Sequence, residues 1–134
     1  PYEVYASTKY LYKKAVKTQF LQDFSEKEME ERVLYCYEKS MKKYLEDKHL
    51  IPNESLYEIS FTQMEKEPLE SMKKIYSNLN LSDFDKNKPN FQAYLKTVKD
   101  YKKNKLVEIP KHIKKQINTR WKFAFENWEY ELVD

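Results

Sequence analysis

The stretch of this chain best suited to binding chemistry is a basic segment in its last third, Lys99-Asp100-Tyr101-Lys102-Lys103-Asn104-Lys105. Its lysines supply concentrated positive charge for a phosphate group, and its tyrosine and asparagine supply directed hydrogen bonds. A run of this composition is more commonly a solvated surface that binds nothing. The segment alone therefore leaves a phosphate site and a solvated surface as alternatives.

Other side chains capable of chemistry have simpler explanations. His49 and His112 are the only histidines and Cys36 is the only cysteine, so the ligands of a zinc site and the partners of a nucleophile are both lacking. We expect structural roles for the two histidines and a core position for Cys36. The glutamates within residues 26–31 fit the first turn of a helix, where the helix dipole favours negative charge.

Three aromatic residues near the C-terminus, Trp121, Phe125 and Trp128, are of the type that stacks on nucleobases. Their spacing of four and three residues also places them on one face of a helix. A core stripe is the commoner fate of such a pattern, so we expect these rings to pack inside the protein.

Charge and composition narrow the classes of partner. The 134 residues carry 25 basic and 22 acidic side chains, which gives a net charge of +3. This balance does not indicate nucleic acid, and none is expected as a partner. Glycine is absent, whereas average usage would give roughly nine in this length. We therefore do not expect a self-contained phosphate-binding loop.

Cysteine usage and hydropathy bear on location. The single cysteine excludes an intrachain disulfide and favours a reducing, cytoplasmic compartment. No run of about 18 apolar residues occurs, so we expect no membrane-spanning helix, and we expect no signal peptide. The chain begins at Pro1 rather than methionine, which leads us to expect a trimmed or partial chain.

Hydrophobic periodicity predicts a mostly α chain with about five helices and one short strand. The first two helices are expected over residues 1–24 and 25–48, the second opened by a capping box of Ser25 and Glu28. Three more helices are expected to open at Pro68, Pro89 and Pro110. Residues 81–88 are predicted to be a loop, residues 101–109 a basic linker and residues 130–134 a tail.

The predicted strand lies between the second and third helices. Leu56, Tyr57, Ile59 and Phe61 form a run rich in aromatic and β-branched residues, which is typical of a strand. Residues 62–67 are predicted to be a polar connection. A single strand has no sheet to join within the chain, so either it packs against strands outside the chain or the assignment fails.

Three stretches follow one another in an order that a known family shares. They are Pro1-Tyr2-Glu3-Val4-Tyr5-Ala6-Ser7-Thr8, then residues 59–69 with the Leu79-Asn80-Leu81 ending, then Tyr101-Lys102-Lys103-Asn104-Lys105 with the aromatic residues of 121–130. In order and spacing they resemble the C-terminal half of a bacterial-type sulfotransferase that uses 3′-phosphoadenosine 5′-phosphosulfate. The match covers nearly the whole chain.

The resemblance implies a nucleotide site. Ser7 falls on the serine of the family's 3′-phosphate motif, whose arginine would lie just before Pro1. Phe61 falls on an aromatic position that lies near the adenine in the family. The third stretch is similar to the family's Tyr-x-x-Asn-basic loop. The nucleotide-binding residues that the resemblance implies are Ser7, Phe61, Lys102, Lys103, Asn104 and Lys105.

Two departures from the family pattern are visible. Thr62 and Gln63 replace the acids that usually follow the aromatic residue at Phe61. The family commonly has glycine before its closing tyrosine, and Glu129 stands there instead, before Tyr130.

The resemblance also implies a fold and an activity. Residues 1–134 would form a single segment, the C-terminal part of a three-layer α/β P-loop-like domain whose phosphate-loop half is absent. The whole enzyme would transfer a sulfuryl group from the nucleotide donor to a hydroxyl or amine, without a metal. The family's base lies upstream, so no catalytic residue is expected here, and the chain alone is expected to be inactive. The first two helices would line part of the acceptor cleft.

Two other functions stay open. A non-enzymatic helical interaction module would use the lysine-rich face of residues 96–122 to bind an acidic partner or nucleic acid, with affinity that falls steeply with salt. A degenerate sulfotransferase would keep the fold without activity, which the residues after Phe61 would permit. The acceptor and the oligomeric state are not indicated by the sequence.

Overall fold

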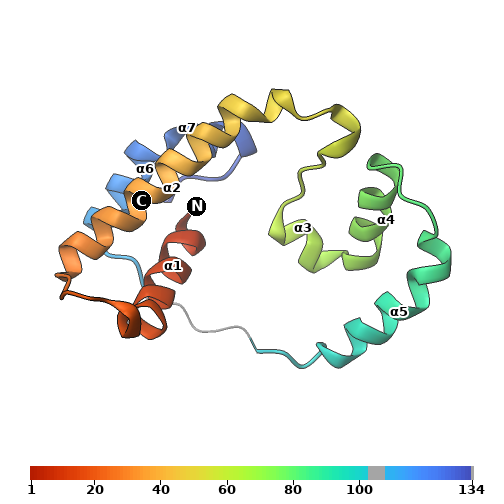
Figure 1. The fold of residues 1–134 in the computed structure, drawn as a ribbon, viewed down its shortest axis with the longest axis horizontal. Coiled ribbons are helices and arrows are strands. Elements are labelled where there is room, and N and C mark those ends of the chain that lie inside the picture. The colour runs from red at the N-terminus through yellow and green to blue at the C-terminus, as the bar shows by residue number, and fades with distance from the viewer. Residues whose placement is uncertain (103–107, 134) are drawn as a thin grey trace. The chain divides into compact units, whose positions relative to one another are not determined.

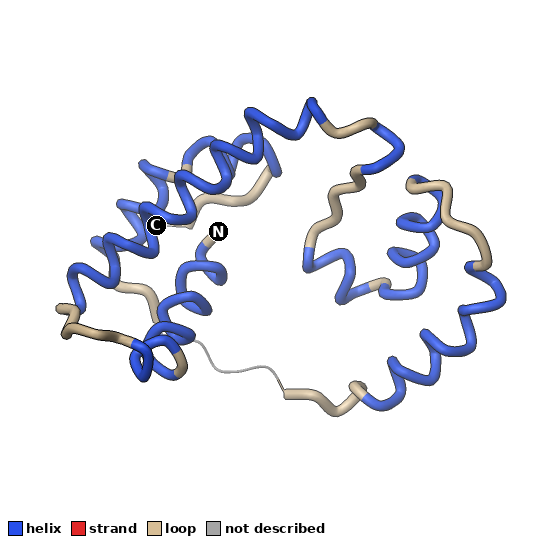
Figure 2. The backbone as a smooth tube through the Cα atoms, in the orientation of Figure 1, coloured by secondary structure: helices blue, strands red, loops and turns tan. Residues whose placement is uncertain are grey.

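The computed structural model describes residues 1–102 and 108–133, with the side chain of Lys17 excepted (Figure 1). Within these residues the chain forms seven α-helices and three short 3-10 helices, and no strand (Figure 2). The prediction of a mostly helical chain is confirmed. The chain divides into two compact units, Pro1–Asp47 with Asn104–Asp134, and Lys48–Lys103. Each unit is described by itself.

The first unit joins the beginning of the chain to its end. Its elements are α1 (Tyr2–Lys14), η1 (Val16–Gln19), α2 (Glu26–Asp47), α6 (Lys111–Arg120) and α7 (Lys122–Trp128). Helices α1 and α6 both pack against α2 (Figure 1). The capping box that opens α2 is confirmed, because the Ser25 N–H donates to Glu28 Oε2 at 2.8 Å and the Glu28 N–H donates to Ser25 Oγ at 3.2 Å.

The first helix ends earlier than predicted. Helix α1 stops at Lys14, and a 3-10 helix over Val16–Gln19 follows it. The Thr18 hydroxyl donates to the Ala15 carbonyl at 2.7 Å, a side-chain bond that satisfies the carbonyl outside a regular helix. Since Val16 and Thr18 are β-branched and helix-poor, the prediction of one helix over residues 1–24 is wrong beyond Lys14.

A buried cluster of side chains from α1, α2, α6 and α7 forms the core of the first unit. Its members are Tyr5, Val33, Leu34, Ile113, Ile117, Trp121, Ala124 and Phe125. The predicted stripe near the C-terminus is therefore a core stripe, and the alternative of a base-stacking platform is wrong for Trp121 and Phe125. Trp128 is half-buried and stacks on Tyr44, with ring centroids 6.3 Å apart.

Trp121 also divides the last predicted helix into two. Its side chain is 0% exposed, and the indole Nε1 donates to the Leu34 carbonyl at 3.1 Å. Its backbone, at φ −103° and ψ 16°, leaves the helical region and ends α6 before α7 begins. The indole is thus seated against α2 at the point where the two helices meet.

Cys36 is exposed, so its predicted core position is wrong. The buried residues of α2 are Met29, Val33 and Leu34, and Tyr37 packs against them. With about 100° of rotation per residue, this set centres the buried face of α2 near Leu34. Cys36 then falls at the margin of that face.

The second unit contains the remaining helices. They are η2 (Lys48–Leu50), η3 (Asn53–Ser55), α3 (Phe61–Lys66), α4 (Pro68–Asn78) and α5 (Phe84–Thr97). Tyr76 of α4 packs edge-on against Phe84 and Phe91 of α5, at centroid distances of 5.4 and 6.0 Å. Ser71 of α4 is buried and donates to the Gln63 carbonyl of α3 at 3.3 Å. Pro68 is the first residue of α4, as predicted.

The predicted strand does not form in the described chain. Residues 56–60 have no regular secondary structure, and Phe61 is the first residue of α3. Ser60 caps this helix, because its Oγ accepts the Gln63 N–H at 3.1 Å. A lone strand lacks the neighbours that would pair its backbone groups, whereas the serine cap satisfies a helical N–H within the segment. The polar connection predicted over residues 62–67 is wrong for the same reason.

Helix α5 starts five residues earlier than predicted. It begins at Phe84, so residues 84–88 are helical and Pro89 lies inside the helix rather than at its start. The Asp83 carbonyl accepts both the Asn87 N–H at 3.0 Å and the Asn87 side-chain amide at 3.1 Å. These bonds fix the first turn, and Pro89 removes only one donor from the turn that follows.

We expect Trp121→Phe to lower the free energy of unfolding by about 2 kcal/mol, because it removes a buried hydrogen bond and leaves a small cavity. Urea unfolding measures this change. Trp128→Phe, at the half-buried ring, is the matched control and should cost less. An equal loss in the two variants would contradict the central role of Trp121.

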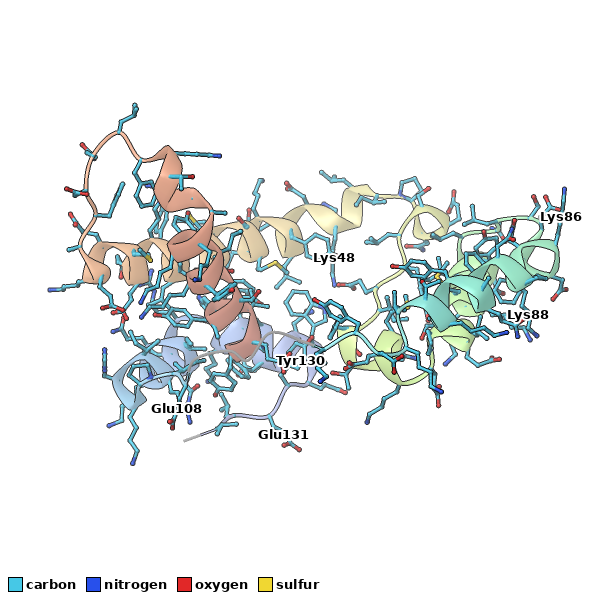
Figure 3. All side chains as sticks on the ribbon, turned by 90° about the horizontal axis from the view of Figure 1, so that it is seen from below. Lys48, Lys86, Lys88, Glu108, Tyr130 and Glu131 are labelled. Atoms are coloured by element: carbon cyan, nitrogen blue, oxygen red, sulfur yellow. The ribbon has the colours of Figure 1, made fainter. Side chains whose placement is uncertain are left out.

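We expect Glu129→Gly to stabilise the protein by about 1 kcal/mol. Glu129 has φ 53° and ψ 39°, a left-handed conformation that glycine adopts without steric cost. The Tyr130 N–H donates to the Phe125 carbonyl at 3.1 Å across this turn, as in a Schellman helix end. Thermal unfolding measures the gain. Glu131→Gly, in the exposed tail (Figure 3), should give none, and a stability loss at Glu129 would refute the backbone argument.

Candidate functional site

Ser7 lies on the outer face of α1. Two residues along a helix correspond to a rotation of about 200°, so Ser7 faces away from Tyr5, which is 1% exposed in the core. Ser7 is exposed. The helix start is fixed by Tyr2, whose hydroxyl donates to Asn118 Oδ1 and accepts the Val133 N–H at 2.9 Å. The Ser7 hydroxyl therefore stands open to solvent on a helix anchored to the core.

Ion pairs attach α1 to α2. Lys9 Nζ lies 2.6 Å from Glu30 Oε1 and 2.9 Å from Glu26 Oε1, and Lys13 Nζ lies 3.0 Å from the same Glu26 atom. Hydrogen bonds from Lys9 and then Lys13 hold the pKa of Glu26 at about 2. Glu28 caps the start of α2, which is the role that the sequence predicted for the acidic cluster. Glu26 and Glu30 also form the ion pairs to α1.

The Tyr5 hydroxyl lies near these charges but inside the core. Among the described residues it has no hydrogen-bond partner within bonding geometry. Burial raises the pKa of Tyr5 to about 12; the charge of Lys9 opposes part of that rise, and the charges of Glu30 and Glu26 add to it. Glu30 is the nearest acceptor, but the hydroxyl does not reach hydrogen-bond geometry with it. Tyr5 is thus a neutral core side chain at physiological pH, with a polar atom whose burial is uncompensated.

The other nucleotide-site residues predicted from the sequence belong to the second unit or lie outside the described chain. Phe61 is the first residue of α3 and is 63% exposed. Lys102 is exposed. Lys103, Asn104 and Lys105 lie outside the described residues. Ser7 belongs to the first unit, so the structure gives no distance that joins it to Phe61 or Lys102.

Further lysines stand on the second unit. Lys86 and Lys88 are exposed on α5 (Figure 3), and every residue from 96 to 102 is exposed as well. Exposure on this scale is what a solvated charged surface and a phosphate-binding surface have in common.

The first unit contains a pocket of about 410 Å³ that the sequence did not indicate. It lies between the end of α1, residues 16–24 and the start of α2. Its lining is mostly aromatic and aliphatic, with three polar side chains: Tyr12, Val16, Gln19, Phe20, Leu21, Gln22, Phe24, Met29 and Arg32. The Phe20 ring packs against Phe24 and Tyr12, at centroid distances of 4.8 and 6.4 Å.

A sequence signal for this pocket did exist. Phe24 precedes the Ser25 cap and Met29 is the fourth residue of α2, the two positions that pair in a hydrophobic staple. Both side chains line the pocket. This pattern in the sequence predicts a sharp turn of the chain at Phe24, with the side chains of Phe24 and Met29 in contact.

A second hollow, of about 350 Å³, lies beside the start of α1. Tyr2, Ala6 and Ile109 contribute apolar surface, and Glu3 and Glu108 bring two carboxylates to it. Figure 3 labels Glu108. Lys114 adds one ammonium group to the lining. The two carboxylates outnumber it and repel phosphate at close range, so this hollow is less suited to a nucleotide phosphate than a purely basic surface.

The remaining candidates carry no site. His49 in η2 and His112 in α6 are both exposed. Among residues 1–102 and 108–133, no group of three or more His, Cys, Asp or Glu side chains is placed to hold a metal ion. The helices of the described chain include none with the length and apolar character needed to cross a bilayer.

Comparison with known proteins gives two relatives. Over 104 residues, which are 78% of this chain, the sequence is 29% identical to the omega-hydroxy-beta-dihydromenaquinone-9 sulfotransferase of Mycobacterium bovis. The same values hold for the sulfotransferase of that name from Mycobacterium tuberculosis. The match covers 27% of the length of each relative. No protein-family model and no solved structure matches the chain.

We expect Tyr5→Phe to change the free energy of unfolding at pH 7 by less than about 1 kcal/mol, because the hydroxyl that it removes does not reach hydrogen-bond geometry with Glu30 or any other described residue. The pH dependence should differ more. A raised pKa in the folded state contributes stability that is complete below pH 10 and is lost as pH rises through about 12. The native protein should lose stability over this range relative to the variant.

Urea unfolding at pH 7 and at pH 11 measures both effects. Tyr10→Phe, at an exposed tyrosine of the same helix, is the control for the loss of a hydroxyl and should leave the free energy of unfolding at pH 7 unchanged. A loss above about 2 kcal/mol for Tyr5→Phe at pH 7 would show that the Tyr5 hydroxyl is bonded.

Proposed function

Since this chain is a distant relative of sulfotransferases over part of their length, we propose that the full-length protein transfers a sulfuryl group from 3′-phosphoadenosine 5′-phosphosulfate to a hydroxyl acceptor. The observation that carries the proposal is the match of 78% of the chain to two sulfotransferases. The order of the three motif-like stretches in the sequence supports the nucleotide donor.

The proposed reaction is a direct displacement at sulfur. The acceptor oxygen forms a bond to the sulfur of the donor, and the bond from that sulfur to the bridging phosphate oxygen breaks. The electron pair of the broken bond leaves on adenosine 3′,5′-bisphosphate, and a base takes the acceptor proton. Cationic and hydrogen-bond donors stabilise the charge that develops on the leaving phosphate. We place the base and the 5′-phosphate loop outside this chain.

Within this chain, Ser7 is the proposed donor to the 3′-phosphate of the nucleotide. Its support is the position of the serine in the first motif and its exposure on an anchored helix. The proposed loop of Lys102, Lys103, Asn104 and Lys105 adds charge at the same phosphate. The proposed contact of Phe61 with the adenine draws support from the place of Phe61 in the second motif and from its relative exposure of 63%.

The relatives' name supports the choice of a hydroxyl over an amine. They are named for an omega-hydroxylated dihydromenaquinone. We extend to this chain only the class of that acceptor group, an alcohol or phenol on a larger molecule.

A second function has one observation in its favour. The lysines at 96, 99, 102, 111, 115 and 122 are all exposed, which a binding module for an acidic partner would require. Such a module would bind polyanions with a steep salt dependence and without preference for one nucleotide. The nucleotide titration below separates the two functions.

We expect Ser7→Ala and Lys103→Ala, each made in the full-length protein, to weaken the binding of adenosine 3′,5′-bisphosphate about tenfold to a hundredfold. Each removes one hydrogen bond to a charged phosphate, worth roughly 1.5–3 kcal/mol. Isothermal titration calorimetry measures the dissociation constant.

Ser40→Ala, at an exposed serine of α2, is the matched control and should bind as the native protein does. Unchanged affinity in both Ser7→Ala and Lys103→Ala would refute the proposed nucleotide site. Equal binding of unrelated polyanions, abolished by salt, would favour the interaction module.

A further inference from the structure

The Ser7 side chain has no hydrogen bond of its own that would fix it in place. It is exposed on α1 and bonds to none of the described residues. The backbone of α1 alone therefore sets the position of its hydroxyl. A hydrogen bond from a hydroxyl to an oxygen requires the two oxygen atoms to lie about 2.5–3.0 Å apart. A small shift of this helix would weaken the proposed contact of Ser7 with a phosphate.

A single hydroxyl attaches the start of α1 to α6 and to the C-terminal tail. The Tyr2 hydroxyl donates to Asn118 Oδ1 and accepts the Val133 N–H at 2.9 Å. Asn118 Nδ2 in turn donates to the Val133 carbonyl at 3.3 Å. The Tyr2 ring packs against Phe125, with the ring centroids 5.3 Å apart. The Asn118 side chain thus binds both of the groups that hold the first turn of α1.

Asn118 stands on a helix that is itself held firmly. The residue before it, Ile117, is 0% exposed in the core. Two residues further on, Arg120 binds Glu31 and Glu38 of α2, at 2.7 and 2.9 Å. Because α6 is fixed both to the core and to α2, its Asn118 can act as an anchor for the start of α1.

Ser7 lies between two attachments of α1. Tyr2 holds the helix before it, and the ion pairs of Lys9 with α2 hold the helix after it. With a rise of about 1.5 Å per residue, Ser7 is roughly 7.5 Å along the helix axis from Tyr2 and roughly 3 Å from Lys9. The start of α1 has no side-chain cap, and an uncapped first turn frays easily. The bonds of Tyr2 are therefore what keeps this turn in place.

From this geometry we propose that Asn118 is a positioning residue of the nucleotide site. It holds the Tyr2 hydroxyl, and through the first turn of α1 it keeps the Ser7 hydroxyl within reach of the 3′-phosphate. Asn118 lies outside the three motif-like stretches of the sequence, so only the fold connects it to Ser7. The inference rests on the proposed function, because it assumes that Ser7 binds this phosphate.

The test compares two nucleotides in the full-length protein. Adenosine 3′,5′-bisphosphate and adenosine 5′-monophosphate differ only in the 3′-phosphate, so the ratio of their dissociation constants reports the contacts of that phosphate. We expect Asn118→Ala and Tyr2→Phe each to lower the preference for the bisphosphate at least about threefold, because a displaced Ser7 loses part of one hydrogen bond to a charged group. Isothermal titration calorimetry measures both constants.

Asn127→Ala, at an exposed asparagine of α7, is the matched control and should keep the native preference. Thermal unfolding of each variant verifies that the fold is retained at the temperature of the titration. Ser7→Ala supplies the second half of the test. If Asn118 acts through Ser7, adding Asn118→Ala to Ser7→Ala should lower the preference little further, since the two effects are then not additive.

Three results would overturn the positioning role: a native preference in Asn118→Ala, an equal loss of affinity for the two nucleotides, or a full further loss when Asn118→Ala is added to Ser7→Ala. The proposed function would stand in each case, because the native protein still prefers the bisphosphate. If the native protein binds neither nucleotide, or binds both equally, the proposed nucleotide site is overturned and the role of Asn118 falls with it.

Discussion

The buried indole of Trp121 is the contact on which the first unit depends. Its Nε1 donates to the Leu34 carbonyl of α2, and its ring lies 4.0 Å from Tyr37 and 6.4 Å from Tyr5, centroid to centroid. One side chain therefore touches α1, α2 and the junction of α6 with α7. Because these elements come from the two ends of the chain, the core can form only after a long loop has closed, with the entropy that this costs. The position of Ser7 on α1 depends on that closure.

The charged residues of the first unit serve mainly to position helices. For this reason, the overall charge of the chain does not indicate which ligand it binds. Lys9 joins α1 to α2 through Glu30, and Arg120 joins α6 to α2 through Glu31 and Glu38. A lysine or arginine used in this way is not available to a phosphate. Among the described residues, no ion pair joins Arg32, Lys99 or Lys102 to an acidic side chain. These cations are therefore better candidates to bind a phosphate or another ligand oxygen than the paired ones.

The sequence predicted those features that depend on residues close together along the chain. The Ser25 capping box, Pro68 at the start of α4 and the core stripe through Trp121 follow from spacing alone, and all three are confirmed. The strand over residues 56–61 failed because strand formation requires a partner, which local composition cannot report. The pocket was missed because it arises where the chain turns back at Phe24. The nucleotide contacts of Ser7 and Phe61 stay predictions, since they rest on residues of different units.

The absence of glycine bears on the relationship to sulfotransferases at one particular residue. After α4, Asn80 has φ 51° and the Leu81 N–H donates to the Tyr76 carbonyl. After α7, Glu129 has φ 53° and the Tyr130 N–H donates to the Phe125 carbonyl, so the two helices end in the same way. Asparagine tolerates the left-handed conformation at low cost, whereas glutamate does not. Glu129 stands where the resembled family commonly has glycine, and its backbone has the conformation that glycine favours. A glycine would adopt this conformation without steric cost, so glutamate at this position does not weigh against the relationship.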